Sequence, residues 1–354
     1  MKWSSEMIRL LGVTYPVIQA PMFGVTTPEM VTAAARAGAL GSLALGDLPA
    51  GKCAEAIRAV KKHTERPFAV NIFVNEVPPV TLELREAYDK TRYFITELAA
   101  TYCLDVSLPG IETLTITDYR DQVQVVIEEN CAVLSFTFGN LDEESILRLK
   151  QNGTVLIGTC TSVAEARVLE QSGIDLICVQ GIEAGGHRGS FSASDVPQIG
   201  GFALLPQVYD EVKVPLIYAG GISSAPMLHA AAMLGAQGFQ VGSLLLGSEE
   251  SALLPFEKQR LRSISENDLL LTRSFSGRYA RGMNNIFIEA MEYSGLVLPY
   301  PYQNKLTGAL RKKARELENA DFVNLWAGQS VNPYAATSTS EIMGSLIAGT
   351  EHLI

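Results

Sequence analysis

Residues 215–246 read PLIYAGGISSAPMLHAAAMLGAQGFQVGSLLL, and this stretch carries the pattern from which the fold can be argued. Two apolar runs, 215–220 and 238–246, lack polar alternation, which is typical of strands buried on both faces of a parallel sheet. Between them, Ser224-Ala225-Pro226 supplies the cap and the proline that begin a helix, and Gly235 ends it. The stretch therefore predicts a strand–helix–strand unit.

The same unit recurs along the first 250 residues. Thr27-Pro28-Glu29 begins one further helix, and the capping box Ser162-Val163-Ala164-Glu165 begins another. Strand–helix alternation implies right-handed crossovers, and eight such units close a barrel better than they fill an open sheet. We therefore predict an α/β fold, a (β/α)8 TIM barrel, with a doubly wound sheet as the alternative. The expected strands are Val17–Met22, Leu40–Gly46, Phe68–Val74, Ala132–Phe138, Thr154–Cys160, Ile174–Gln180, Pro215–Gly220 and Gly238–Leu246.

Two stretches exceed what a minimal barrel needs. Glu76–Asn130 is far longer than one crossover, and its helical spacing predicts one or two helices over the barrel mouth. Ser251–Ile354 follows the eighth strand and includes a polar helix expected at Lys305–Asn319. The predicted division is a ligand-binding barrel over residues 1–250, with a helical insertion at about 76–130, and a helical region over residues 251–354 that covers the active site.

Composition and net charge argue against several classes of function. A net charge of −10 over 354 residues argues against non-specific nucleic-acid binding and against docking on an anionic membrane. No apolar run reaches the roughly 18 residues of a membrane span, and the N-terminus lacks a signal-peptide pattern. The five cysteines include no CxxC pair, so neither a disulfide framework nor a zinc site is expected. We predict a cytoplasmic protein without a metal, either a monomer or a small homo-oligomer.

Glycines follow the last two predicted strands. Gly220 and Gly221 follow the seventh strand, and Gln240-Val241-Gly242-Ser243 follows the start of the eighth. Glycines leave backbone N–H groups accessible, and the loops after strands seven and eight are the usual phosphate site of a TIM barrel. One glycine could be a simple turn residue, but two clusters at the two expected loops predict phosphate binding.

A histidine follows the sixth predicted strand, in the loop QGIEAGGHRG at residues 180–189. Gly185 and Gly186 let the backbone pass close to a flat ligand while the imidazole of His187 projects from it. Histidine titrates near neutrality, so it can act as a general base or as a hydrogen-bond donor. We predict His187 as the catalytic residue. The other histidines fall in predicted helices or at the terminus and are given no role: His63, His229 and His352.

Strands one and three end in residues that can contact the ring of such a ligand. After strand one, the backbone of Ala20-Pro21-Met22 can address a ring edge, and Met22 offers a soft apolar wall. In strand three, the amide of Asn71 can bond a ring carbonyl or nitrogen. Each of these residues, taken alone, is equally well explained as an ordinary strand-end residue.

Together these motifs resemble the nitronate monooxygenases, formerly called 2-nitropropane dioxygenases, over about residues 1–330. The final stretch VNPYAATSTS departs from the tail of that family, so the resemblance assigns it no role. The matching segments are QAPM (19–22), PFAVNIF (67–73), GTCTSVAEA (158–166), QGIEAGGHRG (180–189), PLIYAGGI (215–222), QVGS (240–243), TRSFSGRYARGMNN (272–285), YPYQNKLT (300–307) and WAGQ (326–329).

The resemblance implies noncovalent FMN and His187 as the catalytic histidine. It implies that a nitronate, expected to be propionate 3-nitronate, gives one electron to the flavin, which becomes a semiquinone. The oxidised nitronate then reacts with O2 to give a carbonyl compound and nitrite. The resemblance places Tyr300 and Lys305 at the closure of the pocket. The predicted flavin-binding residues, from position and resemblance together, are Ala20, Pro21, Met22, Asn71, Gln180, Gly185, Gly186, Gly220, Gly221, Gln240, Val241, Gly242 and Ser243.

Four other classes of protein explain fewer of these motifs than the nitronate monooxygenases do. An FMN-dependent enoyl-acyl carrier protein reductase shares EAGGH and the glycine pairs and would use NAD(P)H, but QAPM, NIF, the long insertion and YPYQNKLT favour the monooxygenase. A non-catalytic flavin- or phosphate-binding protein needs no titratable group such as His187. An α-hydroxy-acid oxidase has another Arg–His spacing than His187-Arg188. An IMP dehydrogenase needs a loop cysteine, whereas Cys160 and Cys178 fall in predicted strands.

Overall fold

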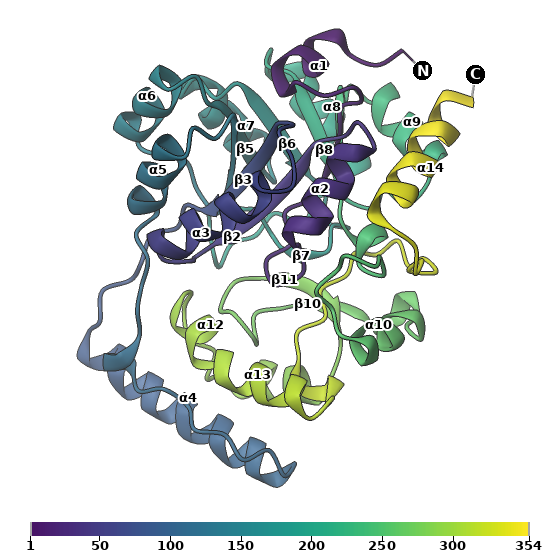
Figure 1. The fold of residues 1–354 in the computed structure, drawn as a ribbon. Helices are drawn as coiled ribbons and strands as arrows, with labels where there is room; N and C mark the ends of the chain where they lie inside the picture. Colours follow the sequence, from purple (N-terminus) through teal and green to yellow (C-terminus); the bar gives the residue numbers. More distant parts are fainter. Residues whose placement is uncertain (1, 353–354) are drawn as a thin grey trace.

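The computed structural model describes residues 2–352 and shows a barrel of parallel strands (Figure 1). The strands pair in the order β1-β9-β8-β6-β5-β4-β3-β2, and a parallel bridge between Ile18 and Leu40 joins β1 to the start of β2. An open doubly wound sheet would leave both edges unpaired, so the TIM-barrel prediction is confirmed and the alternative is wrong. The strands are β1 (Val17–Gln19), β2 (Gly41–Gly46), β3 (Phe68–Phe73), β4 (Val133–Thr137), β5 (Val155–Cys160), β6 (Leu176–Gln180), β8 (Leu216–Ala219) and β9 (Gly238–Val241).

Helices surround the barrel, and two of the three side-chain caps expected from the sequence form; the side chain of Ser224, the third, makes no cap hydrogen bond. Oγ1 of Thr27 accepts a hydrogen bond from the Met30 N–H at 3.1 Å, and Oγ of Ser162 accepts one from the Glu165 N–H at 3.2 Å. Each cap satisfies an N–H that has no partner within the helix. The helices of this layer are α2 (Pro28–Arg36), α3 (Ala50–Lys61), α5 (Tyr119–Glu128), α6 (Glu143–Gln151), α7 (Val163–Gln171), α8 (Gly201–Glu211) and α9 (Ala225–Met233).

The first helix, α1 (Ser5–Leu11), closes the amino-terminal end of the barrel. Its Met7 and Leu11 are buried in one apolar cluster with Ile18 of β1 and with Leu40. Residues of β3 to β8 that face the inside of the barrel complete this cluster. A ligand is therefore left with the opposite end, where the strands finish.

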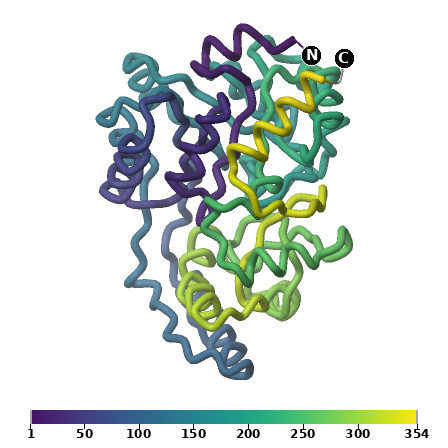
Figure 2. The backbone as a smooth tube through the Cα atoms, turned by 45° about the vertical axis from the view of Figure 1, so that its right-hand side comes forward, coloured from purple at the N-terminus to yellow at the C-terminus, as the bar shows by residue number. Residues whose placement is uncertain are grey.

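The long insertion contains two helices with different neighbours. α5 packs against α3, α6 and β3, so it serves as the crossover helix after β3. α4 (Leu82–Thr101) lies away from the barrel, beside the C-terminal region (Figures 1 and 2). Its Thr91 donates a hydrogen bond to the carbonyl of Leu296 at 2.7 Å, and its Tyr88 belongs to the apolar cluster of that region. α4 and the C-terminal region therefore share one core.

The region after β9, which we call the cap (residues 251–338), contains a small sheet that the sequence analysis did not anticipate. β10 (Leu269–Thr272) pairs with β11 (Ala280–Met283), and β11 pairs with β7 (Gly186–His187), all antiparallel. Short strands of two to four residues leave no readable periodicity. The helices here are α10 (Pro255–Arg262), α11 (Ile286–Glu292), α12 (Tyr302–Leu306) and α13 (Gly308–Glu316), and the 3-10 turns are η3 (Glu266–Asp268) and η4 (Ala320–Phe322). A further 3-10 turn, η2 (Ser243–Leu245), follows β9 before the cap begins.

The last helix, α14 (Thr339–His352), runs along the side of the barrel (Figure 2). It packs against α2 and α9, and its Met343 and Ile347 are buried in the main barrel core. We propose from these contacts that α14 belongs to the helical layer of the barrel, and that the expected boundary near residue 250 separates the barrel from the cap alone. The helices described between residues 2 and 352 include none with the length and hydrophobicity of a membrane span.

Candidate active site

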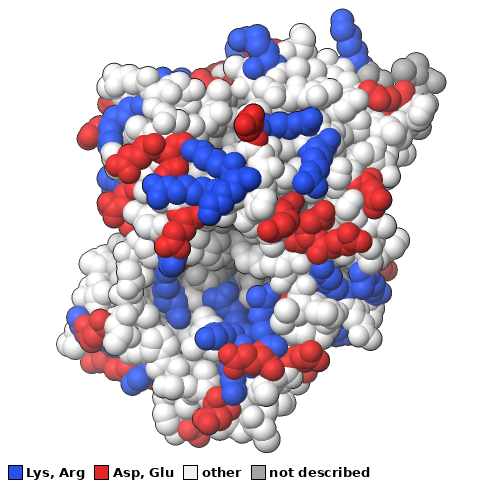
Figure 3. Space-filling view, in the orientation of Figure 1, with Lys and Arg blue, Asp and Glu red and all other residues white. Residues whose placement is uncertain are grey.

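A cavity of about 200 Å³ lies between the carboxyl ends of the strands and the cap. The space-filling view shows a hollow between these two parts, with Lys and Arg side chains around it on the cap side (Figure 3). The structure thus brings residues from the ends of seven barrel strands together with three segments of the cap. The predicted site residues that line the cavity are Ala20, Pro21, Met22, Asn71, Gln180, Gly185, Gly186, His187, Gly220, Gly221, Gln240, Gly242, Ser243 and Tyr300.

The backbone of His187 is held from both sides. Its strand β7 pairs with β11, where His187 lies opposite Ala280. From the barrel side, the amide of Gln180 donates to the His187 carbonyl at 3.1 Å and accepts from the Gly189 N–H at 2.8 Å. The buried guanidinium of Arg188 donates to the carbonyls of Gln180 and Gly181. Gln180 therefore lines the cavity, but its amide is engaged in positioning the histidine loop.

The imidazole of His187 has one nitrogen bonded and one free. Nε2 lies 2.8 Å from Oγ of Ser276, and that hydroxyl donates its single proton to the carbonyl of Arg278 at 3.0 Å. If Nε2 donates to Ser276, both contacts are satisfied at once, because the hydroxyl keeps its single proton for Arg278; the tautomer is assigned from this network. Nδ1 then carries the lone pair, and no residue between 2 and 352 forms a hydrogen bond with it.

The surroundings keep this imidazole uncharged. Burial, followed by the positive charges of Arg278 and Arg311, lowers the pKa of His187 to about 3. Burial disfavours the charged form, and nearby cations disfavour a further positive charge. At neutral pH, His187 is therefore a neutral base rather than an imidazolium.

Aromatic rings enclose the histidine. The ring centres of Phe138, Trp326 and Phe73 lie 5.5, 5.7 and 6.3 Å from that of His187. Tyr300 packs edge-on against both Phe73 and Phe138. These rings surround the half-buried imidazole with apolar surface.

The sequence analysis gave no role to several of these residues. Ser276, Arg278 and Trp326 stand in segments quoted for the resemblance, and Phe73 ends the NIF motif, but their polarity or size alone marks no function. Phe138 follows β4, and Arg311 falls in the helix expected to be polar. The position of Phe73 and Phe138 at strand ends was the one signal available from the sequence.

The glycine loops after β8 and β9 present unpaired donors. Among residues 2–352, the backbone N–H groups of Gly220, Gly221, Gly242 and Ser243 have no hydrogen-bond partner. Gly221 has a φ of +69°, which L side chains rarely adopt, and its carbonyl accepts from the Ser330 hydroxyl at 2.7 Å. These four N–H groups form a cradle, here called the glycine cradle, of the kind that binds phosphoryl oxygens.

The remaining predicted residues fall into two groups. Asn71 donates to Oγ of Ser135 at 2.9 Å and lines the cavity, and the Ala20 N–H donates to the Val241 carbonyl at 2.8 Å. Val241 is buried in the main core and does not line the cavity. Lys305 does not line it either.

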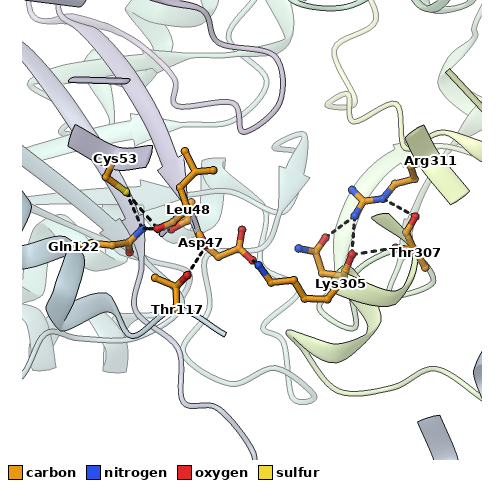
Figure 4. A network of polar contacts seen from close by, with 10 residues as sticks. Asp47, Leu48, Cys53, Thr117, Gln122, Lys305, Thr307 and Arg311 are labelled. Atoms are coloured by element: carbon orange, nitrogen blue, oxygen red, sulfur yellow. Dashed lines mark hydrogen bonds and ion pairs between the residues drawn. The ribbon is translucent and has the colours of Figure 1, made fainter. Parts of the chain in front are cut away.

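Lys305 instead reaches from α12 across to Asp47, which follows β2, with Nζ 2.7 Å from a carboxylate oxygen (Figure 4). The backbone carbonyl of Asp47 accepts from the Thr117 hydroxyl at 2.9 Å. The ion pair therefore joins the cap to the rim of the barrel. It does not present the ammonium group of Lys305 to the cavity.

Comparison with solved structures agrees with this architecture. A nitroalkane oxidase from Streptomyces ansochromogenes has a TM-score of 0.88 and 32% identity, with 98% of each chain covered. FabK from Thermotoga maritima has a TM-score of 0.75 and 25% identity, covering 99% of this chain and 97% of the other. The likeness to both extends over barrel and cap together.

Sequence comparison identifies the family more specifically than the solved structures do. A probable nitronate monooxygenase from Staphylococcus saprophyticus is 39% identical over 334 residues, which is 93% of each chain. One from Staphylococcus aureus (strain Newman) is 35% identical over 349 residues, covering 97% of this chain and 96% of the relative. The family model for nitronate monooxygenase matches residues 4–349. The chain thus belongs to the nitronate monooxygenase family and is an oxidoreductase.

Proposed function

We propose that this protein is an FMN-dependent nitronate monooxygenase that oxidises alkyl nitronates with O2 to a carbonyl compound and nitrite. Propionate 3-nitronate is the expected substrate, and detoxification in the cytoplasm is the expected setting. The observation that carries the proposal is that a neutral His187, surrounded by aromatic rings, and the glycine cradle open into one cavity. Membership of the nitronate monooxygenase family supports the same function.

The residues present fit a flavin mononucleotide. The glycine cradle offers four backbone N–H groups for one phosphoryl group, and the hydroxyl proton of Ser243 is left to donate because its oxygen already accepts from the Gly328 N–H at 2.8 Å. Gly185 lets the backbone of Gly328 come close enough to make this bond, since a Cβ at position 185 would lie 2.5 Å from the Gly328 nitrogen. When bound, the flavin supplies the one-electron acceptor that the expected reaction requires.

In the proposed reaction, His187 acts on the substrate. Its neutral Nδ1 can accept the α-proton of a nitroalkane, while Ser276 holds the ring orientation through Nε2. With a nitronate that is already ionised, the uncharged ring and the aromatic wall exclude water from the reacting carbon. Asn71 and Gln240 line the same cavity and offer amide groups to the flavin ring.

A second candidate function is enoyl reduction with NAD(P)H, because the FabK structure resembles this chain over its whole length. The two functions differ in the electron donor. Oxygen uptake and nitrite release on adding propionate 3-nitronate, without NADPH oxidation in the presence of an enoyl thioester, would support the monooxygenase. The opposite pattern would support the reductase.

The test begins with the absorption spectrum of the purified protein. We expect flavin bands and noncovalently bound FMN, followed by oxygen uptake with alkyl nitronates. His187→Ala should retain FMN and lose most of the turnover, because the base and the ring contact disappear together. The matched control is His63→Ala, at an exposed position that does not line the cavity, which should leave kcat/KM unchanged. A colourless protein that does not take up FMN, or an unchanged kcat/KM in His187→Ala, contradicts the proposal.

A further inference from the structure

One charged side chain stands out in the cavity. Among the residues of the described chain that line it, Arg311 of α13 is the single Asp, Glu, Lys or Arg. Every other lining side chain is neutral, including His187 with its lowered pKa. The cavity therefore carries a net positive charge at one defined place.

The guanidinium of Arg311 has no acidic partner within residues 2–352. Its N–H groups donate to neutral oxygens: the Asn304 carbonyl at 2.8 Å, the Asn304 side chain at 3.0 Å, the Asn324 side chain at 3.3 Å and the Thr307 carbonyl at 3.4 Å. Figure 4 shows Arg311 held against α12 in this way, while the nearby Asp47 is paired with Lys305. Arg311 is half-buried, and an arginine withdrawn from water to this extent is usually paired with an anion, so its guanidinium is oriented but not neutralised.

A second unsatisfied group lies on the same wall. Tyr300 lines the cavity, and its hydroxyl oxygen is buried and has no hydrogen-bond partner in residues 2–352. Arg311 and Tyr300 lie close enough to influence each other, since the Arg311 charge opposes the rise in the pKa of Tyr300 that burial and Asp47 cause. A buried donor without a partner costs free energy that a bound acceptor would recover. Tyr300 and Arg311 thus offer a neutral and a charged donor to one ligand.

We propose that Arg311 and the Tyr300 hydroxyl form an anion-binding subsite that makes this enzyme select the ionised nitronate over the neutral nitroalkane. The inference rests on the proposed function for the identity of its substrate. The glycine cradle has its own donors for the phosphoryl group of the cofactor, which leaves the Arg311 charge for a second anion. In a cavity shielded by aromatic rings, a charge-assisted hydrogen bond is stronger than in water.

The first experiment measures anion binding without turnover. Inorganic nitrate, a planar anion with the O–N–O geometry of a nitronate, is titrated into the flavin-loaded enzyme by calorimetry. Arg311→Gln should weaken nitrate binding about ten- to hundredfold, the range of a lost charged hydrogen bond, and Tyr300→Phe about fivefold. Lys312→Gln removes the same charge from the exposed face of the same helix and should leave nitrate binding unchanged. Equal affinity in Arg311→Gln and wild type, or no binding to wild type, overturns the proposal.

The second experiment uses the kinetics of ethylnitronate and nitroethane. Arg311→Gln should raise KM for ethylnitronate about ten- to hundredfold and KM for nitroethane less than threefold, with Arg311→Lys intermediate for the nitronate. Flavin content, read from the absorption spectrum, should stay at the wild-type level. An equal change for both substrates, or loss of flavin in place of a rise in KM, overturns the subsite.

The two experiments also separate this inference from the proposed function. If wild type binds nitrate through Arg311 but oxidises no nitronate, the anion subsite stands and the proposed reaction fails. If nitronate is oxidised normally and Arg311→Gln alters neither nitrate binding nor KM, the reaction stands and the subsite fails.

Discussion

Nε2 of His187 lies 2.8 Å from Oγ of Ser276, a residue 89 positions further along the chain. The contact is made across the boundary between barrel and cap, because β7 carries the histidine and the segment before β11 carries the serine. The Ser276 hydroxyl is itself fixed by the carbonyl of Arg278. The cap thus sets the tautomer and the orientation of a ring that the barrel supplies.

Ser276→Ala is expected to lower kcat about fivefold to tenfold while leaving the flavin bound, because one neutral hydrogen bond contributes on the order of 1 kcal/mol. Losing it frees the imidazole to rotate, so the proton on Nε2 is no longer fixed. Steady-state oxygen uptake checks the change in kcat. Ser276→Thr retains the hydroxyl and should recover part of the loss, and an alanine variant as fast as wild type would show that the contact does not position the ring.

At acidic pH, the free energy of unfolding should depend on the protonation of His187. Its pKa falls from an ordinary 6.5 to about 3 in the folded protein. Between these values the unfolded chain binds a proton that the folded protein does not, so the stabilisation is complete above pH 6.5 and is lost as the pH falls toward 3.

The slope from this one group is at most about 1.4 kcal/mol per pH unit. Urea unfolding at pH 7, 6 and 5 should show a shallower decline in His187→Asn than in wild type, because asparagine does not titrate. Parallel declines in the two proteins would contradict the lowered pKa. In activity assays, kcat/KM should show no inflection from His187 between about pH 5 and 8.

Gly221→Ala should weaken FMN binding by about tenfold or more. A Cβ at this position would lie 3.2 Å from Cγ of Glu183 and 3.3 Å from Oγ of Ser330, so either these side chains or the glycine cradle must shift by a few tenths of an ångström. The matched control is Gly295→Ala, because Gly295 has the same φ of +69° but no atom within 4 Å of a Cβ. Both variants carry the left-handed strain of about 1 kcal/mol, and only Gly221→Ala should lose flavin. Equal FMN dissociation constants in a fluorescence titration would count against the glycine cradle.

The ion pair between Lys305 and Asp47 should couple cap and barrel by about 1 kcal/mol. Their side chains are 24% and 14% exposed, so solvent screens the pair only in part. We expect Lys305→Met and Asp47→Asn each to lower the free energy of unfolding, and the double variant to be less destabilised than their sum. Urea denaturation of the four proteins gives this double-mutant cycle, and strict additivity would show that the pair contributes nothing.

Much of the barrel could be predicted because it is encoded locally. Apolar runs, helix caps and terminal glycines recur within about 30 residues of one another, and each reflects a hydrogen bond or a buried face of its own element. The strand ends were less accurate: β1 stops at Gln19 rather than Met22, and β9 stops at Val241, followed by η2. At these ends the backbone leaves the sheet to line the cavity, so burial continues where strand pairing has ended.

By itself, the sequence determined the barrel, the glycine loops and the position of His187 at a strand end, because strand order places all of these on one rim. Only the tertiary structure decided that Ser276 fixes the imidazole, that Lys305 pairs with Asp47, and that Arg311 faces the cavity. These contacts join segments far apart in the chain. They form only when the cap packs over the barrel. Local sequence periodicity does not encode that packing.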